Sequence, residues 1–446
     1  MDTPGIQSIR RPEAIFAIVA AIAISYFISQ LVHRLFFHPL RKVPGPWYNA
    51  LFRIGHISNL LSGTTASEVT SLHEKYGAVV RLSPNEVSFI SGETAWQDIY
   101  GFRTGKMRGH ANMPKDPAWY VKAPSGIADI INADDQNHAR HRRVLSHAFS
   151  AEALRGQEPL LQRYADLLVD RLRESAVKES TTQDLTQWFN WATFDIIAHL
   201  CFGVPFGCLQ EKETHKYIRL LFQGLKAFPL HYVSTYWPWF KYVLSMLTPQ
   251  SAIKARGEYY DFVDTRTQHR IATETQYEDF MTEILKHNGE KDVGIDPAEI
   301  TGNMGVFLTA GSETSASTLS AAVYCLLRDP DVMAKLQGEI RGRFKTYNDI
   351  TIGGVNDSPY LIAVLQESLR YFSPVPTGFQ RRVPAGGEVV SDYYLPEGTA
   401  LCVSMYPLGR SNRNFKDPDA FVPERWMGDE RYADDQRDAM QAFSFG

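Results

Sequence analysis

The hydrophobic positions begin with one long uncharged run near the N-terminus. Residues Ala14–Val32 carry no charge, and about twenty apolar residues are enough to cross a bilayer as a helix. The alternative is a cleaved signal peptide, but the run is longer than a usual signal-peptide core. Its A-x-A pair, Ala21 and Ala23, also lies in the middle of the run rather than at its end. The pattern therefore predicts one membrane-spanning helix.

Two features of the following residues bear on the orientation of this helix. The segment Val43–Trp47 (VPGPW) contains two prolines, which fix φ and remove backbone donors, so we expect a stiff extended arm close to the membrane. The flanking basic residues are Arg10 and Arg11 on one side and Arg34, Arg41 and Lys42 on the other. Their slight excess after the helix favours a cytosolic main body.

Alternation with a period of two predicts two small sheet regions. Residues 78–83 and 85–90 alternate around a Ser-Pro-Asn turn, as a hairpin should. Residues 381–405 form strand-like runs separated by Gly386-Gly387 and Pro396-Glu397-Gly398. From about residue 134 to residue 372 the periodicity is helical. The predicted fold class is therefore mostly α with small β-sheets.

The longest predicted helix has clear start and stop signals. Asp296 is a suitable N-cap, with Pro297 at the first position and Glu299 at the third, and the next stop signal is Asp329-Pro330. Between residues 300 and 327 the only charged side chain is Glu313. We therefore expect this helix to be buried nearly all round.

Composition narrows the class of function. Lys and Arg number 46 against 50 Asp and Glu, so there is no basic field for a nucleic acid. The scattered cysteines have neither zinc spacing nor a disulfide pattern, and we expect reduced thiols; they are Cys201, Cys208, Cys325 and Cys402. The expected segments are a tail (1–13), an anchor (14–37), a proline-rich linker (38–50) and one large domain (51–446).

The long helix contains the motif Ala310-Gly311-Ser312-Glu313-Thr314-Ser315. At Gly311 a flat ligand could approach the backbone, and the Thr314 hydroxyl can bond the carbonyl of Ala310 and locally open the helix. Thr314 and Glu313 at such an opening could relay protons. The alternative is a packing face between helices, and this motif alone does not decide between them.

Two further charged motifs are ambiguous when taken alone. Glu367 and Arg370 lie opposite the apolar arc of their helix, which is typical of a solvated ion pair of small value. Arg425, about fifty residues later, could reach back to a carboxylate with two hydrogen bonds.

A fourth motif combines basic and apolar residues on one helical stripe. His138 and Arg142 share this stripe with Leu145 and Phe149, and a basic group that faces inward needs a buried anion. The alternative is a solvated basic face, because the neighbouring residues are also basic: Arg140, His141 and Arg143.

In this order, the four motifs resemble the cytochrome P-450 family, and the resemblance extends over essentially the whole chain. It implies the family's mostly helical, triangular fold with two small sheets, preceded here by one N-terminal transmembrane helix, and a haem b cofactor crossed by the long helix. Ala310 and Gly311 would border the oxygen site. Glu313 and Thr314 would match the family's acid–alcohol pair, which delivers protons.

The same resemblance assigns further residues. His138 and Arg142 would hold one haem propionate and Arg381 the other, with adjacent Arg382 as the alternative. Against the periodicity, a buried structural triad would consist of Glu367, Arg370 and Arg425.

The last residues, Ala442–Gly446, resemble the opening of the family's F-x-x-G-x-R-x-C haem loop, with Phe443 as an expected cofactor contact. The axial cysteine would then lie four residues beyond the end, and no metal ligand is expected within the chain. Because the thiolate anchors the iron, we expect this polypeptide to bind haem poorly and to be inactive. The alternative function is a catalytically dead, membrane-anchored haem-fold relic or a ligand-binding scaffold.

Residues 202–242 are dense in aromatic side chains, which suits an access channel or a membrane-dipping surface for a lipophilic substrate. The alternative is ordinary core packing. The anchor, the arm at residues 38–47 and the stretch at residues 381–388 resemble microsomal enzymes of filamentous fungi, many of which oxidise terpenoids or polyketides in secondary metabolism. The resemblance also implies an NADPH-cytochrome reductase as partner, docked near residues 138–143, and a single-pass location in the endoplasmic reticulum membrane.

Overall fold

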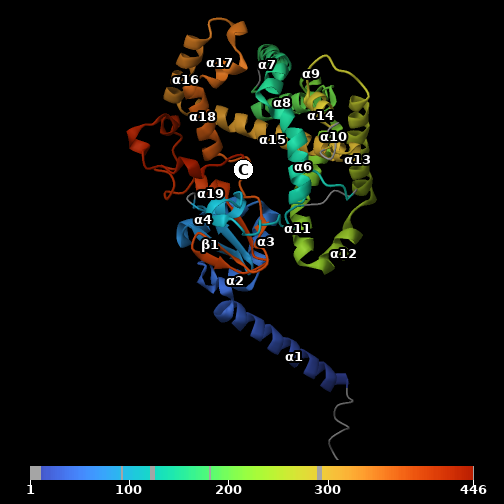
Figure 1. Cartoon of the computed structure of the whole chain (residues 1–446), viewed down its shortest axis with the longest axis vertical. Coiled ribbons are helices and arrows are strands. Elements are labelled where there is room, and N and C mark those ends of the chain that lie inside the picture. The colour runs from blue at the N-terminus through green and yellow to red at the C-terminus, as the bar shows by residue number, and fades with distance from the viewer. Residues whose placement is uncertain (1–11, 92–93, 121–125, 180–181, 289–293, 445–446) are drawn as a thin grey trace, which may run out of the picture. The chain divides into compact units, whose positions relative to one another are not determined.

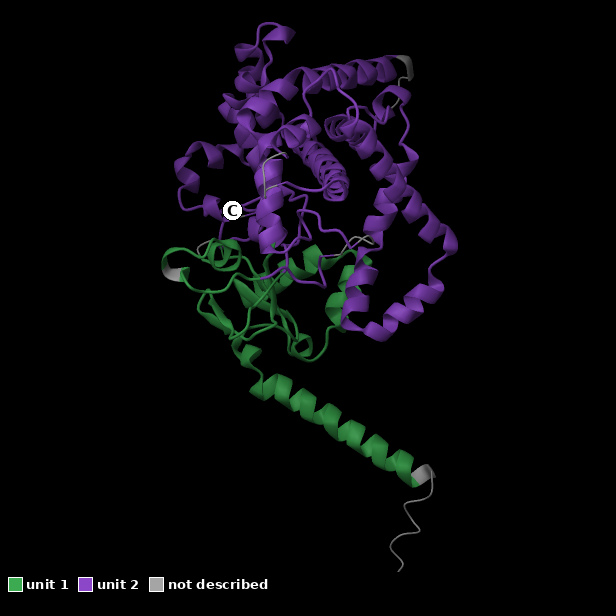
Figure 2. Ribbon diagram, turned by 45° about the vertical axis from the view of Figure 1, so that its right-hand side comes forward, with its two compact units in different colours: residues 1–113, 381–404, 445–446 green, residues 114–380, 405–444 purple. Residues whose placement is uncertain are grey.

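The computed structural model describes residues 12–91, 94–120, 126–179, 182–288 and 294–444. The chain forms two compact units (Figure 2), of which unit 1 contains residues 1–113, 381–404 and 445–446, and unit 2 contains residues 114–380 and 405–444. Helices dominate and the strands are short. The predicted fold class, mostly α with small sheets, is confirmed.

Unit 1 begins with the apolar helix α1, Pro12–Val32, which is extended by a π-helical turn, His33–Phe37. Figure 1 shows α1, at the blue end of the chain, leading into the short helix α2. The segment Ala14–Phe37 is long and apolar enough to cross a membrane, and none of it is buried in the protein. The other helices of unit 1 are α2 (Trp47–Leu51), α3 (Ile54–Ser62), α4 (Thr65–Tyr76) and α5 (Ala95–Tyr100), with 3-10 turns at Pro39–Lys42 and Gly105–Met107.

The arm after the anchor is extended only in part. The backbone is extended at Val43 and at Pro46, but Trp47 already begins α2, so the predicted arm is one residue too long. Pro44 accepts a 2.8 Å hydrogen bond from the amide of Arg81. A Cβ atom on Gly45 would lie 2.7 Å from the Arg81 carbonyl oxygen, which explains a glycine at this close approach to the strand.

Both predicted sheet regions are present in unit 1. The four-stranded sheet has the order β1-β2-β6-β3, with β1 (Val79–Ser83) antiparallel to β2 (Glu86–Phe89) and β2 parallel to β6 (Ala400–Val403). Strand β3 (Arg381–Arg382) pairs antiparallel with β6. A second sheet is the β4–β5 hairpin, Glu388–Val390 and Tyr393–Leu395. All residues of β1, β2 and β6 are buried.

Unit 2 contains most of the helices. Their bounds are α6 Asp135–Leu145, α7 Ala151–Glu179, α8 Leu185–Phe202, α9 Cys208–Glu211, α10 Lys216–Lys226, α11 Phe228–Tyr236, α12 Pro238–Leu247, α13 Gln250–Ile271, α14 Phe280–His287, α15 Pro297–Arg328, α16 Pro330–Arg343, α17 Ile352–Asn356, α18 Pro359–Tyr371 and α19 Met405–Gly409. Short 3-10 turns lie at Ser146–Phe149, Tyr347–Asp349, Pro423–Met427, Glu430–Tyr432 and Arg437–Ala439.

Helix α8 supplies much of the apolar core of unit 2. Asp184 caps its N-terminus and Gly203, in the left-handed conformation, ends it. Most of its side chains are buried, and they join apolar residues of α13, α14 and α15 in one cluster. The long helix α15 packs against this core, and this packing holds the motif Ala310–Ser315 in place.

The boundaries of α15 agree with the sequence, but its burial does not. Asp296 and Glu299 form the predicted capping box, and Asp329 is the C-cap. However, several side chains of the helix are exposed, at Ala310, Glu313 and Ser315 and, further on, at Leu319, Tyr324 and Leu327. The expectation of burial nearly all round was wrong, because an uncharged helix need not face protein on every side.

Candidate active site

The motif on α15 has two faces with different surroundings. Thr314 Oγ1 donates a 2.7 Å hydrogen bond to the carbonyl oxygen of Ala310, the contact expected from the sequence. The helix nevertheless continues without a break from Pro297 to Arg328, so the expected local opening is not present. A Cβ atom on Gly311 would lie 2.7 Å from Ile197 Cδ1 of α8. Gly311 therefore serves the packing of α15 on α8, which was the alternative interpretation for this position.

The open face of the motif carries the acid. Glu313 is exposed on the same side of α15 as Ala310, yet the protein around its carboxyl group desolvates it and raises its pKa. A carboxyl group with a raised pKa keeps its proton at higher pH. Beside the Thr314 hydroxyl, such a group is suited to hold and pass on a proton.

Helix α6 presents basic side chains on its outer face. Asp134 caps its N-terminus through a 2.8 Å hydrogen bond from the amide of Asn137. Arg142 and Arg143 are exposed and His138 is half-buried. Among the described residues, the side chain of Arg142 has no hydrogen bond or ion pair, so its guanidinium is available for an anion.

The neighbours of Arg142 on α6 behave differently. Arg140 donates a 2.8 Å hydrogen bond to Glu299 Oε2 at the first turn of α15, and the fully buried His141 ring lies 3.3 Å from the same carboxylate. The Arg140 hydrogen bond is the main cause that lowers the pKa of Glu299 to about 2. Arg140 and His141 therefore join α6 to α15, and the interpretation as a solvated basic face fails for both. No sequence signal indicated this contact beyond the capping position of Glu299.

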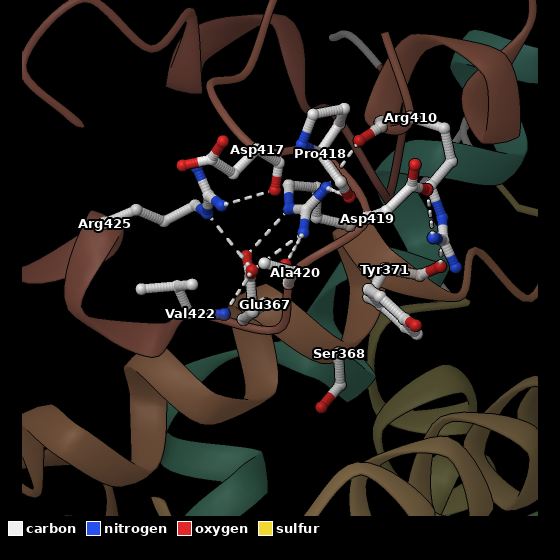
Figure 3. A network of polar contacts seen from close by, with 12 residues as sticks. Glu367, Ser368, Tyr371, Arg410, Asp417, Pro418, Asp419, Ala420, Val422 and Arg425 are labelled. Carbon is white, nitrogen blue, oxygen red and sulfur yellow. Dashed lines mark hydrogen bonds and ion pairs between the residues drawn. The ribbon is translucent and has the colours of Figure 1, made fainter. Parts of the chain in front are cut away.

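The carboxylate of Glu367, on α18, lies at the centre of a buried network (Figure 3). Arg370 donates two 2.8 Å hydrogen bonds to it, and Arg425 Nε donates one of 3.1 Å. The amide of Val422 and the indole of Trp426 add bonds of 2.8 and 2.9 Å. The two arginines and Glu367 are fully buried. The exposed ion pair indicated by helical periodicity was wrong, because the polar side of α18 faces other protein groups instead of water.

Arg425 also reaches a second acid, which no sequence motif indicated. Its Nη1 contacts Asp435 Oδ2, and Asp435 is itself buried. Arg370 completes the network by donating to three carbonyl oxygens, those of Gly409, Pro418 and Ala420. Two arginines and two carboxylates leave the network neutral overall, as burial requires. Asp435 lies in a polar stretch without periodicity, so only the folded chain reveals its role.

The two remaining expected cofactor contacts are Arg381 and Phe443. Arg381 belongs to unit 1, where its Nη1 donates a 3.3 Å hydrogen bond to the Met113 carbonyl oxygen and its buried Nε has no partner among the described residues. Phe443 is almost fully exposed. The last two residues of the haem-loop resemblance, Phe445 and Gly446, lie outside the described residues.

The aromatic stretch at residues 202–242 is divided between the two interpretations. Phe202 and Tyr232 are buried, and Trp119 lies edge-on to Phe228, with ring centroids 4.9 Å apart. On α12, in contrast, no side chain is fully buried, and Trp239 and Tyr242 are strongly exposed. The first part therefore belongs to the core, whereas α12 presents an apolar outer surface.

Comparison with known proteins decides the family. A profile of the cytochrome P-450 family matches residues 44–446. The chain belongs to the cytochrome P-450 family. The matched range includes residues of both units. This P-450 is an oxidoreductase of the monooxygenase class, and its family uses a haem cofactor, generally with a redox partner and lipophilic substrates.

The relatives of this P-450 are fungal enzymes. It is 50% identical over 427 residues to the cytochrome P-450 monooxygenase traB of Penicillium crustosum, an alignment covering 95% of this chain and 84% of the relative. It is 38% identical over 427 residues to the cytochrome P-450 monooxygenase lcsI of Purpureocillium lilacinum, covering 96% and 82%. It is 36% identical over 419 residues to averantin hydroxylase of Dothistroma septosporum, covering 94% and 78%.

The basic residues of this P-450 suit the carboxylates of a haem. The Nε atom of Arg381 is buried without a partner, and Arg142 is unpaired within the described chain. An unpaired buried guanidinium nitrogen is costly unless an anion completes it. That Arg142, His138 and Arg381 hold the propionates stays a prediction, which the unpaired Nε of Arg381 favours.

The cysteines do not suit the iron. All four are free and buried. Burial is the main cause that raises the thiol pKa, to about 12 at Cys208, to about 11 at Cys325, and well above the usual value at Cys201. An iron ligand must be a thiolate, which requires a lowered pKa. Among the described residues there is also no cluster of histidine, cysteine and acidic side chains that could hold a metal ion.

Proposed function

We propose that this protein is a monooxygenase that hydroxylates or epoxidises a lipophilic secondary metabolite of terpenoid or polyketide type. The observation that carries the proposal is the open face of α15, where Glu313 and Thr314 stand beside Ala310 in a helix that is otherwise nearly free of charge. The fungal monooxygenases to which the chain is similar support the substrate class, and one of them is named a hydroxylase of averantin.

The haem, when bound, would supply the iron at which dioxygen is activated. The chain's own residues would do the rest. Arg142, His138 and Arg381 would bind the propionates and so fix the orientation of the cofactor. Glu313, whose pKa is raised by desolvation, would keep its proton to a higher pH than an ordinary carboxyl group, and the Thr314 hydroxyl, which donates to the Ala310 carbonyl, would pass a proton on.

The location belongs to the same proposal. Helix α1 would anchor the protein in the endoplasmic reticulum membrane by a single pass, with the main body in the cytosol. An NADPH-cytochrome reductase would supply electrons, and the basic outer face of α6, with Arg142 and Arg143 exposed, would attract an acidic partner surface.

Proton delivery can be tested by the coupling of product to NADPH. Glu313→Gln and Thr314→Val should lower the product formed per NADPH consumed and leave substrate binding unchanged. In the parent, coupling should also fall as the pH rises through the raised pKa of Glu313, because the donor loses its proton. Ser312→Ala is the matched control, since the Ser312 hydroxyl bonds only within its own helix. If all three variants form as much product per NADPH as the parent, the proton relay is rejected.

A second candidate, a ligand-binding scaffold without redox chemistry, is favoured by the raised pKa of the buried thiols. The two candidates differ in the spectrum of the reduced carbon monoxide complex, recorded for the native protein in microsomes with reductase. The proposal expects a thiolate-type Soret band and oxidation of terpenoids or polyketides. Absence of the band would favour the scaffold, and a thiolate-type band without such oxidation would eliminate the proposed substrate class.

A further inference from the structure

The guanidinium of Arg381 leaves open the edge through which other arginines of this chain hold a carboxylate. Arg370 holds Glu367 through Nε and Nη2, with both hydrogen bonds 2.8 Å long. Arg270 holds Asp279 through the same two nitrogens, with hydrogen bonds of 2.6 and 2.8 Å. At Arg381 the Nε atom is buried and has no partner among the described residues. The Nε–Nη2 edge of Arg381 is therefore suited to receive a carboxylate in the same two-bonded geometry.

Two groups of unit 1 hold this guanidinium on its other sides. Its Nη1 atom donates a 3.3 Å hydrogen bond to the carbonyl oxygen of Met113. Its central carbon lies 5.7 Å from the centre of the Tyr100 ring, within the roughly 6 Å over which an aromatic ring attracts a cation. Neither contact uses Nε. The tyrosine ring therefore restrains the guanidinium without occupying the edge that a carboxylate needs.

The Tyr100 ring is itself held in place at the end of α5. Its hydroxyl accepts a 3.3 Å hydrogen bond from the amide of Val403 on β6. Its ring packs against the buried ring of Trp96, with centroids 5.3 Å apart. Strand β3, which carries Arg381, also pairs with β6. Strand β6 therefore positions both the arginine backbone and the tyrosine ring.

The adjacent arginine has a different role. Arg382 Nη1 donates a 2.8 Å hydrogen bond to the carbonyl oxygen of Gly398. Successive side chains of a strand point to opposite faces of the sheet, so Arg381 and Arg382 do not serve the same ligand. Of the two arginines, Arg381 is the one that the tyrosine ring contacts.

We propose that Tyr100 is a positioning residue, whose ring holds the guanidinium of Arg381 with its Nε–Nη2 edge directed at a propionate carboxylate of the haem. Arg381 then donates two parallel hydrogen bonds to this carboxylate. A planar fork that is already oriented loses less conformational freedom when the ligand binds. Without the ring, cofactor binding has to order the arginine side chain. The inference rests on the proposed function, which assigns Arg381 to a propionate, and adds Tyr100 to it.

The rate of haem loss tests this role. The haem-loaded native protein in detergent is mixed with excess apomyoglobin, which takes up released haem, and the Soret band follows the transfer. Tyr100→Leu and Arg381→Gln should each release haem at least about threefold faster than the parent, whereas Tyr100→Phe, which keeps the ring, should stay within about twofold of it. A Tyr100→Phe variant as fast as Tyr100→Leu would overturn the role of the ring.

The double variant tests whether the two residues act together. If Tyr100 acts through Arg381, Tyr100→Leu combined with Arg381→Gln should release haem no faster than Arg381→Gln alone. Two accelerations that multiply in the double variant would show independent effects and would overturn the proposal.

Haem dimethyl ester, in which both propionates are esterified, separates this role from a general loss of structure. It offers no carboxylate, so the parent, Tyr100→Leu and Arg381→Gln should release it at equal rates. Faster loss of the ester from Tyr100→Leu than from the parent would show that the tyrosine only stabilises the fold, and would overturn the proposal. The matched control is Tyr324→Leu, because Arg328 lies 5.6 Å from the exposed Tyr324 ring in a similar pair; its haem loss should equal that of the parent.

The two proposals fail in different ways. A parent that takes up neither haem nor its ester would overturn the proposed function, and the further inference with it. If the parent and Arg381→Gln lose haem at the same rate, the open edge of Arg381 belongs to a substrate carboxylate instead of a propionate. If Arg381→Gln accelerates haem loss and Tyr100→Leu does not, only the positioning role of Tyr100 is overturned.

Discussion

The buried network around Glu367 makes a strong prediction for stability. Glu367→Gln keeps the shape of the side chain but removes one of two negative charges that balance Arg370 and Arg425. The carboxylate accepts five hydrogen bonds. A glutamine has only one acceptor oxygen, and its NH2 group would point at donors. The substitution therefore leaves an uncompensated charge and unpaired donors at fully buried positions.

The expected cost follows from this geometry. Removing one partner from a buried ion pair costs about 3–5 kcal/mol, because the remaining charge is left without water or a counter-ion. Since domains are stable by only about 5–15 kcal/mol, Glu367→Gln should lose a large share of the free energy of unfolding. Glu367→Gln with Arg370→Gln leaves Arg425 paired with Asp435, so the double substitution should cost less than the sum of its two single changes.

Urea titration of the full-length chain in detergent, followed by far-ultraviolet circular dichroism, measures these differences. The matched control is Lys335→Gln, which breaks the surface pair between Lys335 and Glu424 and should cost about 1 kcal/mol or less. If Glu367→Gln shifts the transition no more than the control, the neutral buried network does not stabilise the fold as argued. Strict additivity in the double substitution would show that Glu367 and Arg370 do not interact energetically.

Two further changes test contacts of α15. Gly311→Ala places a methyl group 2.7 Å from Ile197 Cδ1, whereas the methyl group of Gly305→Ala makes only an ordinary contact at 3.8 Å. In urea titrations the Gly311→Ala variant should therefore be less stable than the Gly305→Ala variant by about 1–3 kcal/mol. Equal stability of the two variants would contradict the close packing. Glu299→Gln removes the acid whose pKa the Arg140 hydrogen bond lowers from 4.5 to about 2. Because the pKa of Glu299 is lower in the folded state, its ionised carboxylate stabilises the fold fully at pH values above the unfolded-state pKa of about 4.5. The difference in melting temperature between parent and variant should therefore shrink as the pH falls from about 4.5 toward 2. A difference that does not change with pH would refute the role of the Arg140–Glu299 contact.

Much of the fold could be predicted because local sequence determined it. The capping residues Asp296, Pro297 and Glu299 marked the start of α15, and Asp329 marked its end. The alternation around Pro84 gave the hairpin of β1 and β2. These signals act within a few residues of the feature they determine. The parallel pairing of β2 with β6, more than three hundred residues away in the chain, had no local signal, and pairing partners could not be predicted.

The contacts of the candidate site could be predicted only where a side chain had a single possible partner. The hydrogen bond from Thr314 to the Ala310 carbonyl follows from helix geometry and was foreseen. For the basic residues around Arg140, a solvated face stays an open alternative in the sequence, although Arg140 binds Glu299. Because its partner lies on another helix, the local sequence does not show whether the arginine side chain contacts water or a carboxylate. Gly311 was ambiguous for a similar reason, since an absent side chain can make room for a ligand or for Ile197.

The misreading of α18 and the inverted pattern of α2 and α3 have one cause. Periodicity assumes that every element has the protein core on one side and water on the other. Behind the polar side of α18 lies a second set of ionic and backbone groups, so Glu367 is buried. On α2 the polar Asn49 is buried and the largely apolar Trp47 is exposed, which is the reverse of the pattern of a helix with water on its outer side. The direction of the departure is informative for α18, because a buried polar face points to an ionic partner within the protein.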